Sequence, residues 1–135
     1  MDSPRKLIHT SLIPIRWGDM DAMGHVNNTV YFRYMEQTRI EWFETLGFGV
    51  GALESEAPVI INASCTFLVP LTYPGTVECR MLAGHPGRSS VPTYHEFRIA
   101  GEDTLYAEGA AKIVWMNPTT GKSVVLPEAL RAAVS

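Results

Sequence analysis

Short β-rich segments dominate the pattern of hydrophobic and polar positions, and one helical segment interrupts them. Residues 7 to 16, "LIHTSLIPIR", predict a strand, with Pro14 marking a sheet edge or the end of regular pairing. After Pro58, four more strands are predicted, "VIINASCTFLV", "TVECRMLAG", "VPTYHEFRIAG" and "TLYAEGAAKIVWMN". The turn sequences "PLTYPG", "HPGRSS" and "GED" separate them. In the third, one face of the strand is expected to hold Val91, Thr93, His95, Phe97 and Ile99, and the other Pro92, Tyr94, Glu96 and Arg98.

The helical segment follows the loop "WGDMDAMGHVNN". Asn27 or Asn28 is expected to cap it, and Thr29 enters its first turn. Hydrophobic positions then recur at spacings of three and four, which predicts a buried face of Tyr31, Met35, Thr38, Trp42 and Leu46. The polar residues that fall away from this face are Arg33, Glu36, Gln37, Glu41 and Glu44. Gly47, in "LGFGVG", is expected to end the helix.

This order of elements predicts an α+β fold, with a five-stranded, mostly antiparallel sheet beside one long central helix. The segment "PEALRAAV" predicts a short closing helix. Because no repeat or linker interrupts the sequence, residues 1–135 are expected to form a single domain. The broad stripe of the helix and the two sheet edges need covering, so we expect a symmetric dimer at least.

Composition excludes several classes of protein. The sequence is 46% hydrophobic and 19% charged, which is too apolar for disorder, and no window is long enough to span a membrane. The N-terminal residues lack a secretory pattern, so we expect a cytoplasmic protein. Cys65 and Cys79 have no metal-binding spacing, and we interpret them as buried thiols rather than as a disulfide or ligands. A net charge of −3 without basic runs argues against a nucleic-acid partner.

The loop before the helix concentrates polar side chains, and the simplest interpretation is turn chemistry. A calcium loop is rejected, because Met23 and Val30 occupy positions that need oxygen ligands. A transition-metal site on Asp19, Asp21 and His25 lacks a further His or Cys nearby. The glycines of "GFGVG" follow a helix, which excludes a dinucleotide fingerprint, and "GHPGRSS" lacks the lysine of a P-loop.

One chemical interpretation uses the whole loop. The free N–H groups at the start of a helix can polarise a carbonyl and hold the oxyanion that forms on attack. A carboxylate six or seven residues earlier can act as a nucleophile or as a base for water. Gly24 would let the backbone approach the substrate, and Asn27 and Asn28 could orient it. These features indicate acyl transfer or hydrolysis, with turn chemistry as the alternative.

The segment "RWGDMDAMGHVNNTVYFRYMEQTR" resembles the signature of the 4-hydroxybenzoyl-CoA thioesterase-like family, which has the hotdog fold. The turns "VPLTYPG" and "GRSS" extend the resemblance over roughly residues 7 to 118, and "HVNN" is similar to the branch of small bacterial long-chain or broad acyl-CoA thioesterases. The resemblance implies hydrolysis of a fatty or aromatic acyl-CoA. We expect no metal and no cofactor, because the acid and the helix end supply both halves of the chemistry, and we expect a homodimer or homotetramer with no membrane partner. An acyl channel would lie between subunits, lined by Met35 and by residues 63 to 67.

By position, the resemblance implies that Asp21 is the catalytic carboxylate and that the backbone N–H of Asn28 polarises the thioester. Asp19 is expected to tie down the loop. The substrate-binding residues implied are His25, Asn27, Tyr31, Arg88, Ser89 and Ser90, of which the last three would meet the coenzyme A nucleotide.

Two other hotdog chemistries fit the sequence less well, and one alternative function remains. The glutamates of the helix lie on its polar face, which disfavours the hotdog lineage that uses a helical Glu. The hotdog hydratases need a Gly-Asp-x-Asn-Pro-x-His motif, and here His25 comes six residues after Asp19 with no Asn-Pro between them. The alternative function is a hotdog protein that binds acyl-CoA or an acyl carrier without turnover.

Overall fold

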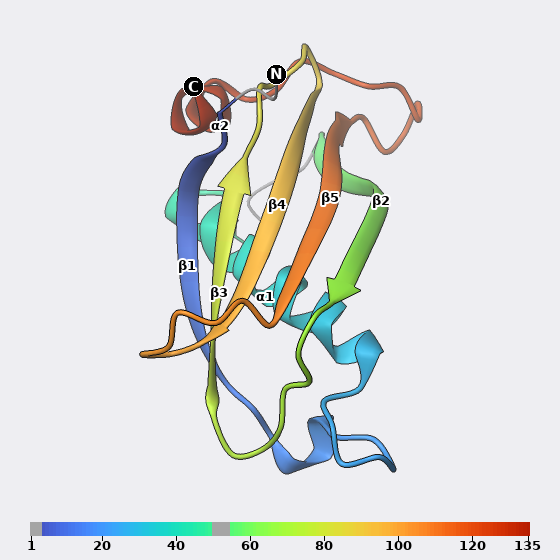
Figure 1. The fold of residues 1–135 in the computed structure, drawn as a ribbon. Coiled ribbons are helices and arrows are strands. Elements are labelled where there is room, and N and C mark those ends of the chain that lie inside the picture. Colours follow the sequence, from blue (N-terminus) through green and yellow to red (C-terminus); the bar gives the residue numbers. More distant parts are fainter. Residues whose placement is uncertain (1–3, 50–54) are drawn as a thin grey trace.

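The computed structural model describes residues 4–49 and 55–135. They form a five-stranded antiparallel sheet with one long helix against it (Figure 1). The strands are β1 (Lys6–Pro14), β2 (Ala57–Phe67), β3 (Thr76–Ala83), β4 (Ser90–Ile99) and β5 (Ala107–Met116). They lie in the order β1-β3-β4-β5-β2, which leaves β1 and β2 at the two edges.

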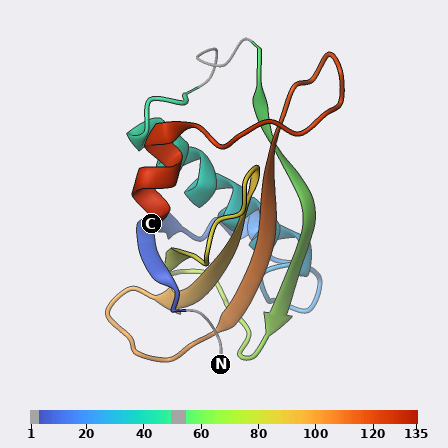
Figure 2. The same ribbon diagram turned by 90° about the horizontal axis from the view of Figure 1, so that it is seen from above.

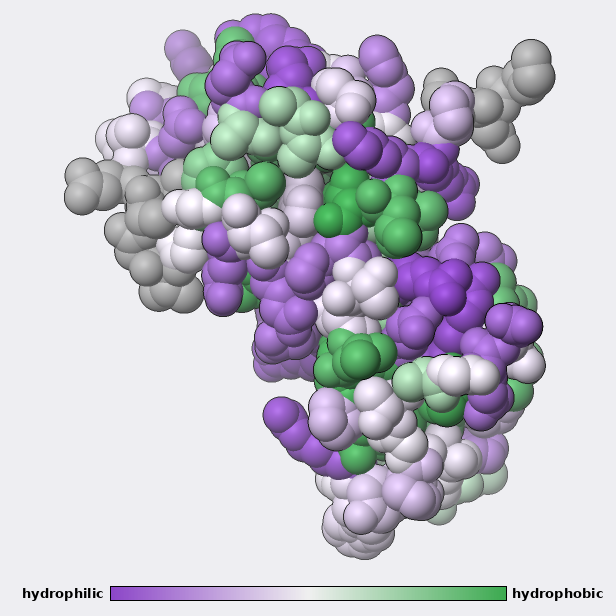
Figure 3. All heavy atoms as spheres, turned by 90° about the vertical axis from the view of Figure 1, so that its left-hand side faces the viewer, coloured by the Kyte–Doolittle hydropathy of each residue, from purple (hydrophilic) through white to green (hydrophobic). Residues whose placement is uncertain are grey.

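The helices are η1, a single 3-10 turn (Trp17–Asp19), α1 (Asn28–Thr45) and α2 (Glu128–Val134). The sheet curves around the side on which α1 lies, and α2 packs beside β1 (Figure 2). No helix within the described ranges is long and apolar enough to cross a membrane. From the β1 side, hydrophobic residues form separate patches among hydrophilic ones (Figure 3).

The ends of α1 follow the predicted signals. Asn27 is the cap, because its side-chain oxygen accepts a hydrogen bond of 2.9 Å from the backbone N–H of Thr29. Gly47 follows the helix with a φ of +86°, a conformation that glycine adopts without steric cost. The predicted boundaries of the helix are therefore confirmed.

The predicted buried face of α1 is confirmed for its helical members, and Leu46 just beyond the helix is half-buried. The pattern missed Tyr34 and Phe43, which are also buried. It was wrong about Glu41, whose carboxylate accepts a hydrogen bond of 2.8 Å from Ser11 on β1. This carboxylate also lies 3.1 Å from the His9 ring, so Glu41 joins α1 to the edge strand.

The core has two halves along α1. The half beneath its N-terminal turns holds Tyr31, Tyr34, Met35 and Phe97, and the half beneath its C-terminal turns holds Trp42, Trp115 and Leu130 of α2. Burying one such large side chain contributes roughly 1.5–3 kcal/mol. The alternation predicted for β4 is confirmed, since Val91, Thr93, His95 and Phe97 are all buried. Packing of α1 against the sheet therefore fixes the position of the N-terminal end of this helix.

Both cysteines are free thiols on strands, as expected. Cys79 is buried, and burial raises the pKa of its thiol to about 12. Cys65 is only half-buried, and burial raises its pKa to about 11. Both thiols therefore keep their protons at neutral pH, which makes them poor metal ligands and poor nucleophiles.

Candidate active site

The connection between β1 and α1 folds into a tight, hydrogen-bonded loop. Met20 and Val26 pair as an isolated antiparallel bridge. Between them, the N–H of Asp21 donates to the carbonyl of His25 at 2.8 Å, and the N–H of Gly24 donates to the carbonyl of Asp21 at 3.0 Å. Gly24 has a φ of +77°, which few other residues adopt. The turn chemistry considered from sequence is therefore present, and it fixes the backbone of Asp21.

Asp19 anchors this loop to both flanking elements. Its Oδ2 accepts hydrogen bonds from the backbone N–H of Arg16 at 2.9 Å and from the hydroxyl of Tyr34 at 2.8 Å. Its carbonyl accepts from the N–H of Asn27 at 2.9 Å. Burial, followed by the hydrogen bond to the Asp19 carboxylate, raises the pKa of Tyr34, so this hydroxyl remains a donor. The geometry agrees with the anchoring role expected for Asp19.

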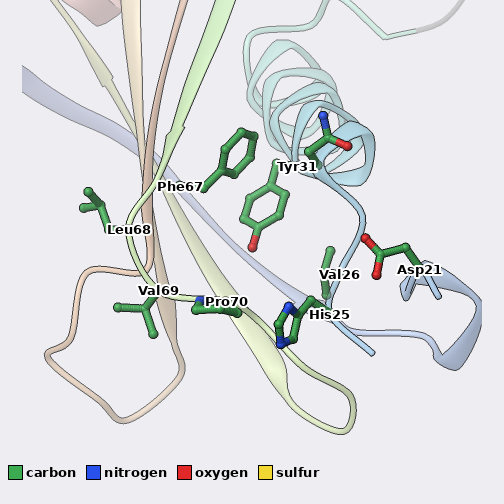
Figure 4. Close-up of a pocket in the computed structure, with 9 residues that line it drawn as sticks. Asp21, His25, Val26, Tyr31, Phe67, Leu68, Val69 and Pro70 are labelled. Atoms are coloured by element: carbon green, nitrogen blue, oxygen red, sulfur yellow. The ribbon is translucent and has the colours of Figure 1, made fainter. Parts of the chain in front are cut away.

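Asp21 lies at a cavity of about 340 Å³ between the loop, the start of α1 and the chain that leaves β2. One side of the cavity is lined by Asp21, His25, Val26, Asn28 and Tyr31, and the other by residues 67–70. In Figure 4, Asp21 projects towards Val26 and the start of the helix, and the hydroxyl of Tyr31 points into the same space. Oδ1 of Asp21 accepts from the N–H of Met23 at 2.9 Å. No bond to Oδ2 occurs among the described residues, so this oxygen is free to react.

The start of α1 supplies a hydrogen-bond donor to the same cavity. Asn28 is the first helical residue, so its N–H has no acceptor within the helix. The Asn27 side chain accepts from the N–H of Thr29, and the Asn27 carbonyl accepts from the N–H of Val30. Among the described residues, the N–H of Asn28 has no partner. It lies at the positive end of an 18-residue helix, where negative charge is stabilised.

An aromatic cluster closes the inner side of the cavity. The buried ring of Tyr31 packs edge-on against Phe67, with ring centroids 4.8 Å apart, and against Phe97 at 5.6 Å. The hydroxyl of Tyr31 accepts from the N–H of Leu71 at 3.4 Å. Burial raises the pKa of Tyr31, so its hydroxyl stays protonated. The cavity therefore joins a polar mouth to an apolar wall, as a site for an acyl group requires.

The predicted site residues do not all meet in one chain. Arg88, Ser89 and Ser90 lie at the opposite end of the sheet, because Ser90 pairs with Val114 at the far end of β5. Phe67, which lines the cavity, pairs with Ala107 of β5, and Ala107 pairs with Phe97 of β4. The cavity therefore lies at the level of Phe97, seven residues after Ser90 along β4. At about 3.4 Å per residue, this separation is roughly 24 Å. Asn27 also does not line the cavity, since its side chain caps the helix.

Sequence reasoning missed the wall formed by Leu68, Val69 and Pro70, which line the cavity just beyond β2. The signal was the apolar run "FLVP", most of which was assigned to the predicted strand, whereas β2 ends at Phe67 and leaves Leu68 and Val69 free to line the cavity. Met35 and Ala63, predicted to line an acyl channel, do come together at a second hollow of about 250 Å³ between α1 and β2. Within residues 4–49 and 55–135, no group of three or more His, Cys, Asp or Glu side chains is placed to hold a metal ion.

A five-stranded antiparallel sheet with a helix packed against it matches the hotdog fold of thioesterases. The sequence profile of the thioesterase-like superfamily matches residues 15–134, so the chain belongs to this superfamily. Membership confirms the predicted family and the predicted class of enzyme, a thioester hydrolase.

Individual relatives agree with this assignment. The chain is 41% identical to the PA2801 protein of Pseudomonas aeruginosa, a proposed thioesterase, with a TM-score of 0.92 over 96% of this chain and 100% of that one. It is 26% identical to BH1999, a gentisyl-coenzyme A thioesterase, with a TM-score of 0.80 over 90% and 98% of the two chains. A proposed esterase of Aquifex aeolicus is 30% identical over 69 residues, 50% of this chain and 54% of that protein. That match thus spans about half the length of the curated relative.

Proposed function

We propose that this protein hydrolyses the thioester of a fatty or aromatic acyl-CoA to the free acid and coenzyme A. The observation that carries the proposal is that Asp21 and the unpaired N–H of Asn28 face one cavity with an apolar inner wall. The thioester carbonyl oxygen would accept from the N–H of Asn28, and the carboxylate of Asp21 would act on the carbonyl carbon or on water. The acyl group would lie against Tyr31 and Phe67.

Both roles of Asp21 are chemically complete. As a base, its free oxygen takes a proton from water while the water oxygen attacks the carbonyl carbon. The resulting oxyanion is held at the helix start, and its collapse expels the thiolate, which recovers the proton from Asp21. As a nucleophile, Asp21 forms an anhydride with the acyl group and expels the thiolate, and water then hydrolyses the anhydride.

The remaining site residues receive narrower roles. His25 is exposed at the rim of the cavity, where its ring can meet the thiol side of the substrate. Asn27 keeps only its amide nitrogen for a ligand, because its oxygen accepts from both the N–H and the hydroxyl of Thr29. Because Arg88, Ser89 and Ser90 lie far from this cavity in their own chain, they can meet its nucleotide only if a neighbouring subunit supplies them.

We also propose a homodimer or homotetramer in which the β2 edge and the adjoining face of α1 are covered. β2 is an 11-residue edge strand with Ile61 and Phe67 about half exposed. Phe32 and Ile40 on α1 are more than one-third exposed. An unpaired, apolar edge of this length is a site for pairing with another chain. In such an assembly, the sheet of each subunit would wrap around the long central helix of that same subunit.

A panel of acyl-CoA substrates, assayed by release of free thiol, tests the proposal. Aliphatic thioesters of increasing length and benzoyl-type thioesters should separate the two acyl classes. The gentisyl-coenzyme A thioesterase acts on an aromatic thioester, which supports including that class. Release of thiol that survives prolonged treatment with a chelator is the expected result. Tight binding of an acyl-CoA without thiol release would instead indicate the non-catalytic alternative.

A further inference from the structure

The candidate active-site cavity is short in the direction of α1. The helix contributes only Asn28 and Tyr31 to its lining, and these residues are three positions apart, or about 4.5 Å along the axis at 1.5 Å per residue. Phe32 and Met35, which follow on the helix, line the separate hollow of about 250 Å³. Within the described ranges, the two hollows share no lining residue. A group bound at the helix start therefore meets a boundary within one helical turn.

Two aromatic rings form this boundary. Tyr31 comes from α1 and Phe67 from the last position of β2, and their rings meet edge-on with centroids 4.8 Å apart. Figure 4 shows the two rings side by side between the helix and the strand, at the end of the cavity away from His25 and Pro70. Edge-to-face contacts of this kind are favourable beyond the area that they bury. The ring pair therefore separates the cavity from the space further along α1 and β2.

The two rings differ in how firmly they are held. Tyr31 is buried, packs against Phe97 and accepts a hydrogen bond from the N–H of Leu71. The side chain of Phe67 is 46% exposed at the edge of the sheet. The backbone of Phe67 is held by pairing with Ala107 of β5, which does not depend on the ring. Phe67 is therefore the ring that can change without disturbing the buried core.

The ring of Phe67 also occupies the path along the inner face of β2. Side chains two positions apart on a strand share a face, so Cys65 is the next residue of β2 on the same side as Phe67. Cys65 has a much smaller side chain and is half-buried. Truncating Phe67 to alanine removes the ring and lets the cavity extend along β2 towards Cys65.

We propose that the Phe67 ring sets the upper limit of acyl length, so that the enzyme prefers short acyl-CoA thioesters, such as butanoyl and hexanoyl, to long-chain ones. A chain that starts at the N–H of Asn28 buries its first methylenes against Tyr31 and Phe67, and each buried methylene favours binding. Later methylenes meet the ring pair and turn out of the cavity, so they add nothing. The inference rests on the proposed function, because that function places the thioester at Asn28.

A series of acetyl-, butanoyl-, hexanoyl-, octanoyl- and decanoyl-CoA tests the inference. For the wild-type protein, kcat/KM should rise about tenfold for each two methylenes that are buried, and the rise should end no later than hexanoyl. Phe67→Ala should move the optimum to a longer chain. Phe67→Leu, which keeps an apolar side chain at the edge, should move it in the same direction. Phe32→Ala is the matched control, because it removes an exposed ring that lines only the second hollow, and its profile should equal that of the wild type.

A binding measurement separates this inference from the proposed function. S-alkyl thioethers of coenzyme A lack the carbonyl group and cannot be hydrolysed, so calorimetric titration with the same chain lengths measures the limit without turnover. If no thioester is hydrolysed but thioether affinity shows the limit and Phe67→Ala removes it, the proposed function fails and the inference stands. If thioesters are hydrolysed and wild-type kcat/KM rises through decanoyl-CoA, the inference is overturned and the proposed function stands. An unchanged optimum in Phe67→Ala, or an equal shift in Phe32→Ala, also overturns the inference.

Discussion

Asp19 and Asp21, separated by one residue, face different hollows on opposite sides of α1. Asp19 lines a hollow of about 540 Å³ between α1 and β1, together with Arg16 and Tyr34. Asp21 lines the cavity on the β2 side, together with Asn28. In an extended chain, residues two positions apart point to the same side. Here Asp19 ends the 3-10 turn η1 and Asp21 follows the bridge between Met20 and Val26, so the two carboxylates lie apart. The two acids therefore have separate environments.

We predict that Asp21→Asn lowers kcat for acyl-CoA hydrolysis by about a hundredfold to ten-thousandfold, the range typical of losing a general acid or base. The amide can still accept from the N–H of Met23, so the loop should keep its fold. KM should change little, because the lost interaction belongs to the transition state. Steady-state kinetics on the best substrate of the panel checks this.

Asp19→Asn is the matched comparison. It weakens the bonds from Arg16 and Tyr34, so it should lower stability by about 1–2 kcal/mol and reduce kcat less. Thermal unfolding measured beside the kinetics separates the two effects. If a folded Asp19→Asn protein is inactive while Asp21→Asn turns over normally, the roles of the two acids are reversed.

We predict that Gly109→Ala destabilises the protein by about 1–3 kcal/mol, the usual cost of overpacking a core. The new methyl group would lie 2.8 Å from the sulfur of Met35 and 3.3 Å from the carbonyl oxygen of Ser64. In a Met35→Ala background the same substitution should cost less, because the sulfur is gone. Urea unfolding of the four proteins measures this coupling, and strictly additive costs would show that Met35 moves aside freely.

We predict that His95 makes the protein less stable in acid. The pKa of His95 is about 3 in the fold and about 6.5 in an unfolded chain. Below about pH 6.5 the unfolded state therefore binds a proton that the folded state does not. The free energy of unfolding should fall by up to about 1.4 kcal/mol per pH unit between those values. Urea unfolding across this range should show a shallower slope for His95→Gln, whereas substituting the exposed His85 should leave it unchanged.

We predict that Ile61→Lys dissociates the oligomer. Ile61 lies on the β2 edge, and a lysine there places charge on the surface proposed to pair with another subunit. Light scattering at micromolar concentration should give a multiple of 14.9 kDa for the wild type and the monomer mass for the variant. Leu12→Lys, on the opposite edge strand β1, is the control and should keep the wild-type mass. A monomeric wild type would contradict the assembly.

Local signals were sufficient to predict the elements of this fold. The spacing of Tyr31, Met35, Thr38 and Trp42 indicated a helix, and the alternation through Val91 to Phe97 indicated a strand with one buried face. The order of strands within the sheet depends on contacts between distant segments, which no local pattern contains. Glu41 shows the limit: its helical position looks polar, and its partners His9 and Ser11 come from thirty or more residues away.

The candidate site was predictable on its loop side only. Asp21 and Asn28 are seven residues apart, so a loop leading into a helix brings them together. Leu68 and Val69 enter the site from the far side of the sheet, through pairing of β2 with β5. Their apolar character in sequence is equally compatible with burial in the core.

Leu71 is a fixed junction between the two walls of the candidate active-site cavity. Its N–H donates to the hydroxyl of Tyr31, and its carbonyl accepts from the N–H of Val26 at 2.8 Å. The nearby Leu68 and Val69 are held through their N–H groups, which both donate to the carbonyl of Tyr106. Side chains at positions 68 and 69 can therefore be exchanged without disturbing the junction that holds Tyr31 and Val26. A lineage built on this scaffold can thus change the apolar wall of the cavity while the loop and helix start on its other side are inherited unchanged.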